Sequence, residues 1–498
     1  MRLSNWIAAA AASVVSLSAQ NLKDFEKNVT EFTLDNGLHF IVVERHRAPV
    51  ISFHTYVNAG SVDDPQGKTG LAHMFEHMAF KGTQEIGSKN WTDEKDAIAK
   101  VEKIYDDLDA EKAKGPKADP ERIRSLQADL QGAIERASSF VDTNLFPRII
   151  EENGGSGLNA STGEDSTNYF YSLPSNRAEL WFLLESARFK DPVYREFYKE
   201  RNVVREERRM RTESDPQGKL IEALGSTAIQ AHPYRVPPIG WASDIENLRV
   251  GDAKKFFETY YAPVNLTIAV VGDVDAAQAR QWAEKYFGPI TKRPYPPRPT
   301  TVEPPQNGTK TAEVESPSQP IEFIAYKRPD QYSQDDPVFD VVAGILSGGR
   351  TGLMYKTLVR DRRLALAAGA GASFPGSKYP GLFLLYLVPA MGKGLPENEK
   401  AVDEILEGLR QKPVDSATLE RIKTKTRAGL IQQLDSNSGL AGLLASYYVN
   451  YGDWRKLFTS IEDIDKVTAE DVQRVAKTYF IDKNKTVAYL KAPAGAAQ

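Results

Sequence analysis

Two histidines and a glutamate stand close together in the chain, in the order His73, Glu76 and His77. Apolar residues recur around them at spacings of three and four, which predicts an amphipathic helix that begins near residue 69 and stops at residues 81–82. Because the two histidines then lie one turn apart on one face, both imidazoles can bind one Zn2+, and Glu76 can reach metal-bound water as a base. This order is the inverse of the commoner zinc-protease motif.

Two histidines on a solvated surface, or on a core face with their hydrogen bonds satisfied, are the alternative interpretation of this cluster. The chain has only 6 histidines among 498 residues, so a chance match is on the order of half a percent, and we favour a metal site. A catalytic zinc usually has three protein ligands and keeps one place for water. The chain has no cysteine, so the third ligand must offer nitrogen or oxygen.

The composition is typical of a soluble globular protein with at least two domains, because 498 residues exceed one ordinary core. The formal net charge of -4 comes without a dominant block of either sign, so nothing indicates nucleic-acid binding. No segment reaches about 18 unbroken apolar residues, and we expect no membrane anchor.

The first residues predict a cleaved secretory signal. Arg2 precedes an apolar, alanine-rich run over residues 6–17, and small residues follow it. We therefore expect residues 1–19 to be a signal peptide and the mature protein to be exported, either periplasmic or secreted. An apolar N-terminal helix that frays is the alternative.

A proline-rich stretch at residues 291–308 predicts an extended linker between two related parts. For six residues on its N-terminal side, the same residue type recurs 219 positions later in the chain. These residues are Ile245, Asp252, Thr259, Tyr260, Asn265 and Thr267, which match Ile464, Asp471, Thr478, Tyr479, Asn484 and Thr486. Both segments are typical of a helix followed by a strand. A duplication is the simplest interpretation, so we expect an N-terminal zinc domain at residues 24–290 and a homologous C-terminal domain at residues 309–494.

The second copy lacks the metal motif. Residues 351–353 repeat the Thr-Gly-Leu of residues 69–71, and this offset of 282 places Tyr355, Leu358 and Val359 where the first copy has its two histidines and glutamate. The C-terminal half contains no histidine, so we expect it to be non-catalytic.

The two offsets differ by 63 residues, which predicts an insertion in the first copy. The charge-dense region at about residues 90–140 carries two apolar stripes separated by a Gly/Pro-containing stretch at residues 115–120, so we expect a helical hairpin there. A structural elaboration is the simpler role for this hairpin, and a partner-docking arm is the alternative.

An acidic helix is predicted over residues 195–209. Glu200 and Glu207 are seven residues apart and share a face, whereas Glu206 points about 100° away from Glu207. Taken alone, such a helix is more often a solvated charged surface than a source of metal ligands.

Several motifs in this order resemble the pitrilysin-type, or insulinase-like, zinc metallopeptidases. They are the His73 to His77 cluster and residues 159–162, 165–169, 200–207 and 232–234. The resemblance covers nearly all of the mature chain, including the two-copy layout. It implies an α/β fold in which each of two tandem copies is an α+β sandwich, with helices packed on a mixed sheet.

The resemblance also implies roles for individual residues. One zinc ion per chain would be bound by His73, His77 and Glu207. Glu76 would be the general base, and Glu200 would be a further carboxylate that steadies the site. The implied reaction is hydrolysis of peptide bonds in peptides or unstructured segments, inside a closed chamber.

Asn159 and Ala160 are implied to lie on an edge strand that pairs with the substrate backbone. From the opposite wall, the family usually supplies an arginine and a tyrosine seven residues later. Arg360 matches the arginine, but Ala367 stands in place of the tyrosine. We therefore expect a heterodimer with a homologous subunit that lacks zinc ligands and completes the wall, and a homodimer remains open.

Two other function classes compete with the endopeptidase. One is a non-catalytic structural or assembly subunit of a processing-type complex, which the intact zinc set disfavours. The other is a different zinc hydrolase such as an amidase, which the edge strand and the second copy disfavour, because a small substrate needs neither.

Overall fold

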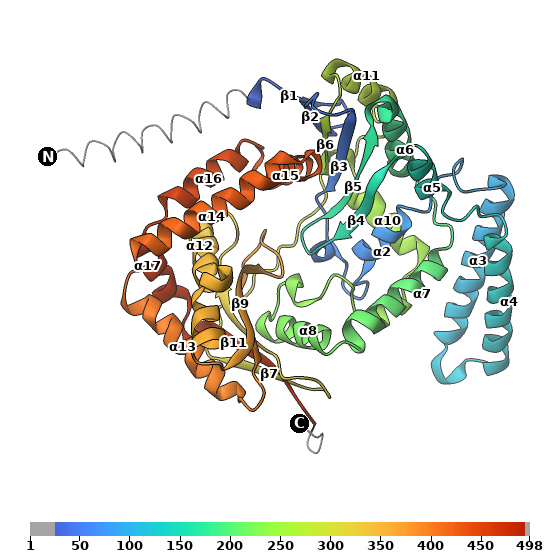
Figure 1. Ribbon diagram of the computed structural model, residues 1–498. Coiled ribbons are helices and arrows are strands. Elements are labelled where there is room, and N and C mark those ends of the chain that lie inside the picture. Colours follow the sequence, from blue (N-terminus) through green and yellow to red (C-terminus); the bar gives the residue numbers. More distant parts are fainter. Residues whose placement is uncertain (1–24, 494–498) are drawn as a thin grey trace.

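The computed structural model describes residues 25–493, which fold into two halves, each built on one β-sheet (Figure 1). The first sheet has six strands in the order β1-β2-β6-β3-β5-β4, and the second has five in the order β7-β11-β8-β10-β9. Both sheets are mixed, since β2 pairs in parallel with β6 and β11 with β7, while the other pairs are antiparallel. The predicted α/β fold with two mixed sheets is confirmed.

The first half contains strands β1 to β6 and helices α2 to α11. Its strands are Val29–Thr33, His39–Glu44, Val50–Val57, Ser156–Thr162, Thr167–Pro174 and Leu266–Gly272. Its helices are Leu71–Met78, Trp91–Lys112, Pro120–Ser138, Leu145–Glu152, Ala178–Lys190, Phe197–Arg208, Pro216–Ala228, Ala242–Glu246, Val250–Tyr260 and Ala276–Tyr286.

The second half contains strands β7 to β11 and helices α12 to α17. Its strands are Lys310–Glu315, Glu322–Arg328, Ala365–Phe374, Gly381–Pro389 and Lys485–Lys491. Its helices are Asp336–Ser347, Leu395–Gln411, Ser416–Asp435, Asn437–Tyr451, Lys456–Lys466 and Ala469–Tyr479. Helix α10 and strand β6 begin 219 residues before α17 and β11 (469 − 250 and 485 − 266), which supports the proposed duplication.

The two halves exchange helices across their sheets. Helix α15 belongs to the second half but packs on β3 and β6 of the first sheet, where one buried cluster contains Ile41, Val43, Val271, Leu440 and Leu444. Helix α8 belongs to the first half but packs on β7 and β11, with Leu220, Leu224, Phe323, Ala325 and Leu490 in one cluster. Each half therefore covers one face of the other half's sheet (Figure 1).

Helices α3 and α4 pack side by side in the region where the sequence predicts a helical hairpin (Figure 1). The stretch 291–308 has no helix or strand. No helix within residues 25–493 is both long and apolar enough to cross a membrane. The expected signal peptide, residues 1–19, lies outside the described residues.

Candidate metal centre

The metal motif lies on a helix that is shorter than the sequence predicts, because α2 spans Leu71–Met78 rather than the stretch from near residue 69 to residues 81–82. Gly70, which precedes it, has the left-handed φ of 85°, and a Cβ there would lie 2.6 Å from the Ile239 carbonyl oxygen. The Asp64 carboxylate accepts hydrogen bonds from the Gly70 and Ala72 backbone N–H groups, at 2.7 and 2.8 Å. The start of the helix is thus fixed by glycine geometry and by a carboxylate that binds free N–H groups.

Helices α2 and α7 contact each other and bring three predicted ligands together. The Oε2 atom of Glu207 lies 3.7 Å from Nε2 of His73 and 3.5 Å from Nε2 of His77. Ligand atoms of all three residues lie within 4.8 Å of one another, and no second cluster of this kind occurs among residues 25–493. Two donors on a tetrahedral zinc ion are roughly 3.3 Å apart, so this donor set fits zinc.

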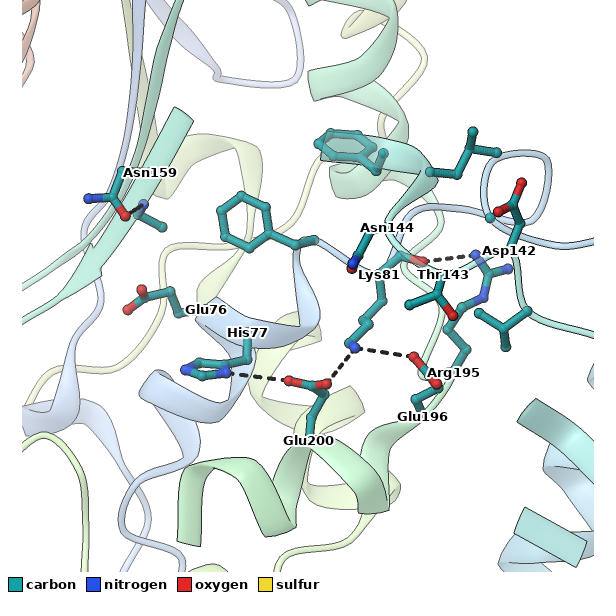
Figure 2. A pocket seen from close by; sticks show the side chains of 16 residues that line it. Glu76, His77, Lys81, Asp142, Thr143, Asn144, Asn159, Arg195, Glu196 and Glu200 are labelled. Atoms are coloured by element: carbon teal, nitrogen blue, oxygen red, sulfur yellow. Dashed lines mark hydrogen bonds and ion pairs between the residues drawn. The ribbon is translucent and has the colours of Figure 1, made fainter. Parts of the chain in front are cut away.

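Glu200, one of the predicted site residues, reaches the second nitrogen of His77. Its Oε2 atom lies 3.4 Å from His77 Nδ1, and its Oε1 atom accepts a hydrogen bond from Lys81 Nζ at 2.5 Å (Figure 2). A carboxylate on the far nitrogen of a metal-binding histidine fixes the ring orientation and tautomer. Lys81 in turn fixes the carboxylate.

The electrostatics of the site favour a cation. Burial alone would lower the pKa of His77, but hydrogen bonds with Glu200 and Glu207 raise it to about 9. Burial and the neighbouring His77 lower the pKa of His73 to about 4. The hydrogen bond with His77 lowers the pKa of Glu207. Burial of Glu200 is outweighed by hydrogen bonds from His77 and Lys81, so its pKa also lies below the usual value. Both carboxylates are therefore ionised near neutral pH.

Glu76 lies beside this donor set and faces open space. It lines a cavity of about 290 Å³ and a wider groove of about 940 Å³, together with His77, Asn159 and Ala160. Burial raises the pKa of Glu76, and a hydrogen bond with Thr162 only partly opposes this. A carboxylate with a raised pKa is better suited to hold and release a proton.

Strand β4 is an edge strand, paired on one side with β5. It carries Asn159 and Ala160, and it contacts α2. The predicted substrate-binding pair therefore lies next to Glu76, and the outer edge of the strand is available to an extended peptide.

Arg360 does not line the spaces around Glu76. It lies in a π-helical turn, Tyr355–Asp361, of the second half, where it is exposed and paired with Asp361 at 2.6 Å. The sequence offset of 282 aligns this turn with the motif helix of the first half, and its Leu358 is buried among apolar side chains.

Sequence reasoning missed Lys81 and Arg211. The Nη1 atom of Arg211 lies 2.8 Å from Oε1 of Glu207, the carboxylate oxygen that faces away from the histidines. The spacing of four residues on a helix is a usable signal for such a pair. The π-helical turn Arg209–Glu213 begins two residues after Glu207, and such turns are frequent at functional sites. It has no comparable signal in the sequence.

Known proteins resemble this chain over most of its length. Residues 40–101 match the family described as "Insulinase (Peptidase family M16)", and residues 247–426 match "Peptidase M16 inactive domain". The zinc protease PqqE of Helicobacter pylori is 29% identical over 96% of this chain and 95% of its own length. A probable mitochondrial-processing peptidase subunit beta of Arabidopsis thaliana is 22% identical over 91% of this chain and 76% of its own length.

Solved structures agree with these matches. A protease from Helicobacter pylori superposes with a TM-score of 0.77 at 28% identity, over 93% of this chain and 99% of that one. The periplasmic protease PqqL from Escherichia coli gives 0.68 at 14% identity, over 93% of this chain and 47% of that one, which supports the fold alone. With matched segments in both halves and relatives that span nearly its full length, the chain belongs to the M16 family of peptidases.

Proposed function

We propose that this chain is a zinc-dependent endopeptidase that cleaves peptides or unstructured protein segments. The observation that carries the proposal is the convergence of His73, His77 and Glu207, with Glu76 beside them at the wall of an open groove. The zinc protease PqqE, which matches nearly the whole chain, supports this reaction class.

His73, His77 and Glu207 would hold the zinc ion. When bound, zinc supplies Lewis acidity, which polarises a peptide carbonyl and activates water near neutral pH. A carboxylate oxygen of Glu76 accepts the proton from the attacking water and then returns it to the nitrogen of the leaving amine. Glu200 keeps His77 oriented through Nδ1 while the reaction proceeds.

Strand β4 would bind the substrate as an added strand. Main-chain hydrogen bonds to the edge that carries Asn159 and Ala160 hold the peptide in an extended form, whatever its sequence. Substrate side chains next to the cleaved bond can then enter the cavity of about 290 Å³ beside Glu76. Extended binding favours unstructured segments over folded domains.

We propose further that the active unit is a heterodimer with a homologous subunit that lacks zinc ligands and supplies an arginine and a tyrosine to the opposite wall. Arg360 lines neither cavity around Glu76, and Ala367 provides no phenol. A homodimer is the alternative. The name of one relative, a processing peptidase subunit beta, supports a paired assembly. Export to the periplasm, or secretion, is proposed from residues 1–19 and from the relative whose title calls it periplasmic.

A non-catalytic subunit is the second candidate function. It is favoured by the match of residues 247–426 to a domain described as inactive. Residues 247–426 contain none of the three proposed zinc ligands. The description "inactive" therefore fits the second copy better than the whole chain.

The deciding experiment measures zinc content and cleavage of an unstructured, quenched fluorescent peptide, with the chain alone and with a homologous subunit. Glu76→Gln is expected to keep zinc and to lower kcat by about 10² to 10⁴-fold. Glu284→Gln is the control, because Glu284 is an exposed glutamate that pairs with Arg280 and lines neither of the two spaces around Glu76. Equal cleavage by Glu76→Gln and the wild type would refute the general-base role. Zinc binding without cleavage of any peptide, with or without a partner, would favour the non-catalytic subunit.

A further inference from the structure

The helical hairpin α3–α4 stands beside α7, the helix that carries Glu200 and Glu207 (Figure 1). A continuous series of contacts runs from the root of this hairpin to His77. The series begins at Glu94 in the first turn of α3 and continues through Arg195 and Lys81.

The first contact is a buried ion pair. Arg195 Nε lies 2.7 Å from Glu94 Oε1, and Arg195 Nη2 lies 3.3 Å from Glu94 Oε2. The two side chains are 1% and 0% exposed. Removing a charge from water is costly unless an opposite charge compensates it, so neither group is tolerated here without the other. The root of the hairpin and Arg195, two residues before α7, are therefore fixed to each other.

The remaining N–H groups of Arg195 bind the loop that follows the metal-motif helix. Nη1 donates to the carbonyls of Lys81 and Ile86 at 2.8 and 2.7 Å, and Nη2 donates to the carbonyl of Thr83 at 2.7 Å. A Cβ on Gly87, whose φ is 92°, would lie 2.4 Å from Nη1. The loop is shaped around the guanidinium group.

Lys81 links this loop to the metal centre through Glu200. Its Nζ atom donates to Glu200 Oε1 at 2.5 Å and to Glu196 Oε2 at 3.2 Å, and Glu200 Oε2 lies 3.4 Å from His77 Nδ1 (Figure 2). A contact of 3.4 Å is at the long end of hydrogen bonding. A small displacement of the Glu200 carboxylate is enough to release the imidazole.

A second set of contacts joins the hairpin to α7 itself. The ring of Tyr105 on α3 stacks on Tyr198 of α7 with centroids 3.8 Å apart. Tyr198 donates to Glu102 Oε2 at 3.1 Å, and Arg201 Nη2 donates to the Tyr105 hydroxyl oxygen at 3.1 Å. Helix α7 is thus held by α3 as well as by its contact with α2.

We propose that the α3–α4 hairpin is a supporting element of the metal centre, in which Arg195 and Lys81 are positioning residues that fix Glu200 and, through it, the imidazole of His77. The inference rests on the proposed zinc peptidase function and gives the hairpin a role in it. A hairpin that only docked a partner would not need its root joined to the loop beside a metal ligand.

The test measures the zinc dissociation constant of the full chain by competition with a chelator, together with the melting temperature of the metal-free protein. Lys81→Met removes the ammonium group and keeps the length of the side chain. The double variant Glu94→Gln/Arg195→Met removes both buried charges at once, so that no unpaired charge is left inside. Each is expected to raise the zinc dissociation constant by roughly 10-fold or more.

The matched control is the double variant Asp336→Asn/Arg328→Met in the second half. Buried Arg328 donates to the carbonyls of Pro329 and Ala372 and pairs with Asp336, which repeats the arrangement around Arg195 away from the metal centre. This control is expected to lower the melting temperature without changing zinc affinity. Lys81→Arg, which keeps donors for Glu200, is expected to restore most of the affinity lost in Lys81→Met.

Combining Lys81→Met with the Glu94/Arg195 pair is expected to weaken zinc no further than either alone, because both act on the same contacts. Zinc affinity within about twofold of wild type in Lys81→Met and in the double variant would overturn the inference and leave the peptidase proposal standing. Absence of zinc binding by the wild type would overturn the proposed function instead, and the inference with it. If the double variant does not fold, the result for Lys81→Met decides.

Discussion

Glu303, in the linker between the halves, offers a quantitative test of how they are joined. One of its carboxylate oxygens accepts a hydrogen bond from the backbone N–H of Gln230 at 2.8 Å and from Lys327 Nζ at 2.8 Å. The other accepts from the N–H groups of Ala231 and His232 at 2.9 and 3.1 Å. The side chain is 7% exposed. One carboxylate therefore connects the first half, the linker and strand β8.

These bonds set the size of the expected effect. Burial would raise the pKa of Glu303, but the hydrogen bonds from the three backbone groups and Lys327 lower it from 4.5 to about 2. Each pKa unit corresponds to about 1.36 kcal/mol, so ionisation of Glu303 stabilises the folded chain by roughly 3 kcal/mol near neutral pH. Because the folded-state pKa is the lower one, this stabilisation is complete above about 4.5 and is lost as the pH falls towards about 2.

The perturbation is Glu303→Gln, compared with wild type by urea unfolding at several pH values. We expect the pH-dependent part of the difference in unfolding free energy to be about 3 kcal/mol near pH 7, about 2 kcal/mol near pH 3.5 and under about 0.5 kcal/mol near pH 2. Glu315→Gln, at an exposed glutamate at the end of β7, controls for the loss of one charge. A difference that stays constant between pH 7 and pH 3.5 would refute this account of Glu303.

Three further predictions concern the metal centre and the junction of the halves. Glu207→Gln is expected to weaken zinc by roughly 100-fold or more in a chelator competition, and wild-type affinity in this variant would exclude Glu207 as a ligand. Leu444→Ala removes a fully buried side chain of α15 from the first sheet, and urea unfolding is expected to show a loss of about 2 to 5 kcal/mol. Gly240 has a φ of 77°, and a Cβ there would lie 2.4 Å from the backbone nitrogen of Gly70. Gly240→Ala is therefore expected to lower the unfolding free energy by more than about 1 kcal/mol, and an unchanged melting curve would contradict the close approach.

The ligand-bearing elements are readable from the sequence because helical periodicity places residues on faces. It predicts that His73 and His77 share one face and that Glu200 and Glu207 share another. Periodicity does not predict that these two faces meet, because the crossing of α2 and α7 depends on packing between distant segments. Only the resemblance to a family implies that His73, His77 and Glu207 act together. In the structure, Glu207 Oε2 lies 3.7 and 3.5 Å from the Nε2 atoms of the two histidines.

The parts that were not predicted depend on long-range contacts of single side chains. The sequence around Arg195 predicts a charged, solvated helix. In the structure, the Arg195 side chain is 1% exposed and donates to three backbone carbonyls of the loop after α2. Helix α2 begins about two residues later than the apolar periodicity predicts, because the left-handed turn at Gly70 ends the preceding segment. The exchange of α8 and α15 was also missed, since an apolar helix does not reveal which sheet it will cover.

The exchanged helices bear on how such a chain arises and how it can be divided. A single copy of this unit, folded alone, would leave one apolar face of its sheet open to water, because the helix that covers it comes from the other copy. Two unlinked copies could cover each other by exchanging these helices, so the duplicated chain has the form of a fused, domain-swapped homodimer. For the same reason, a chain cut within residues 291–308 is expected to remain associated as two fragments, since α8 and α15 would still pack on the sheet of the other half.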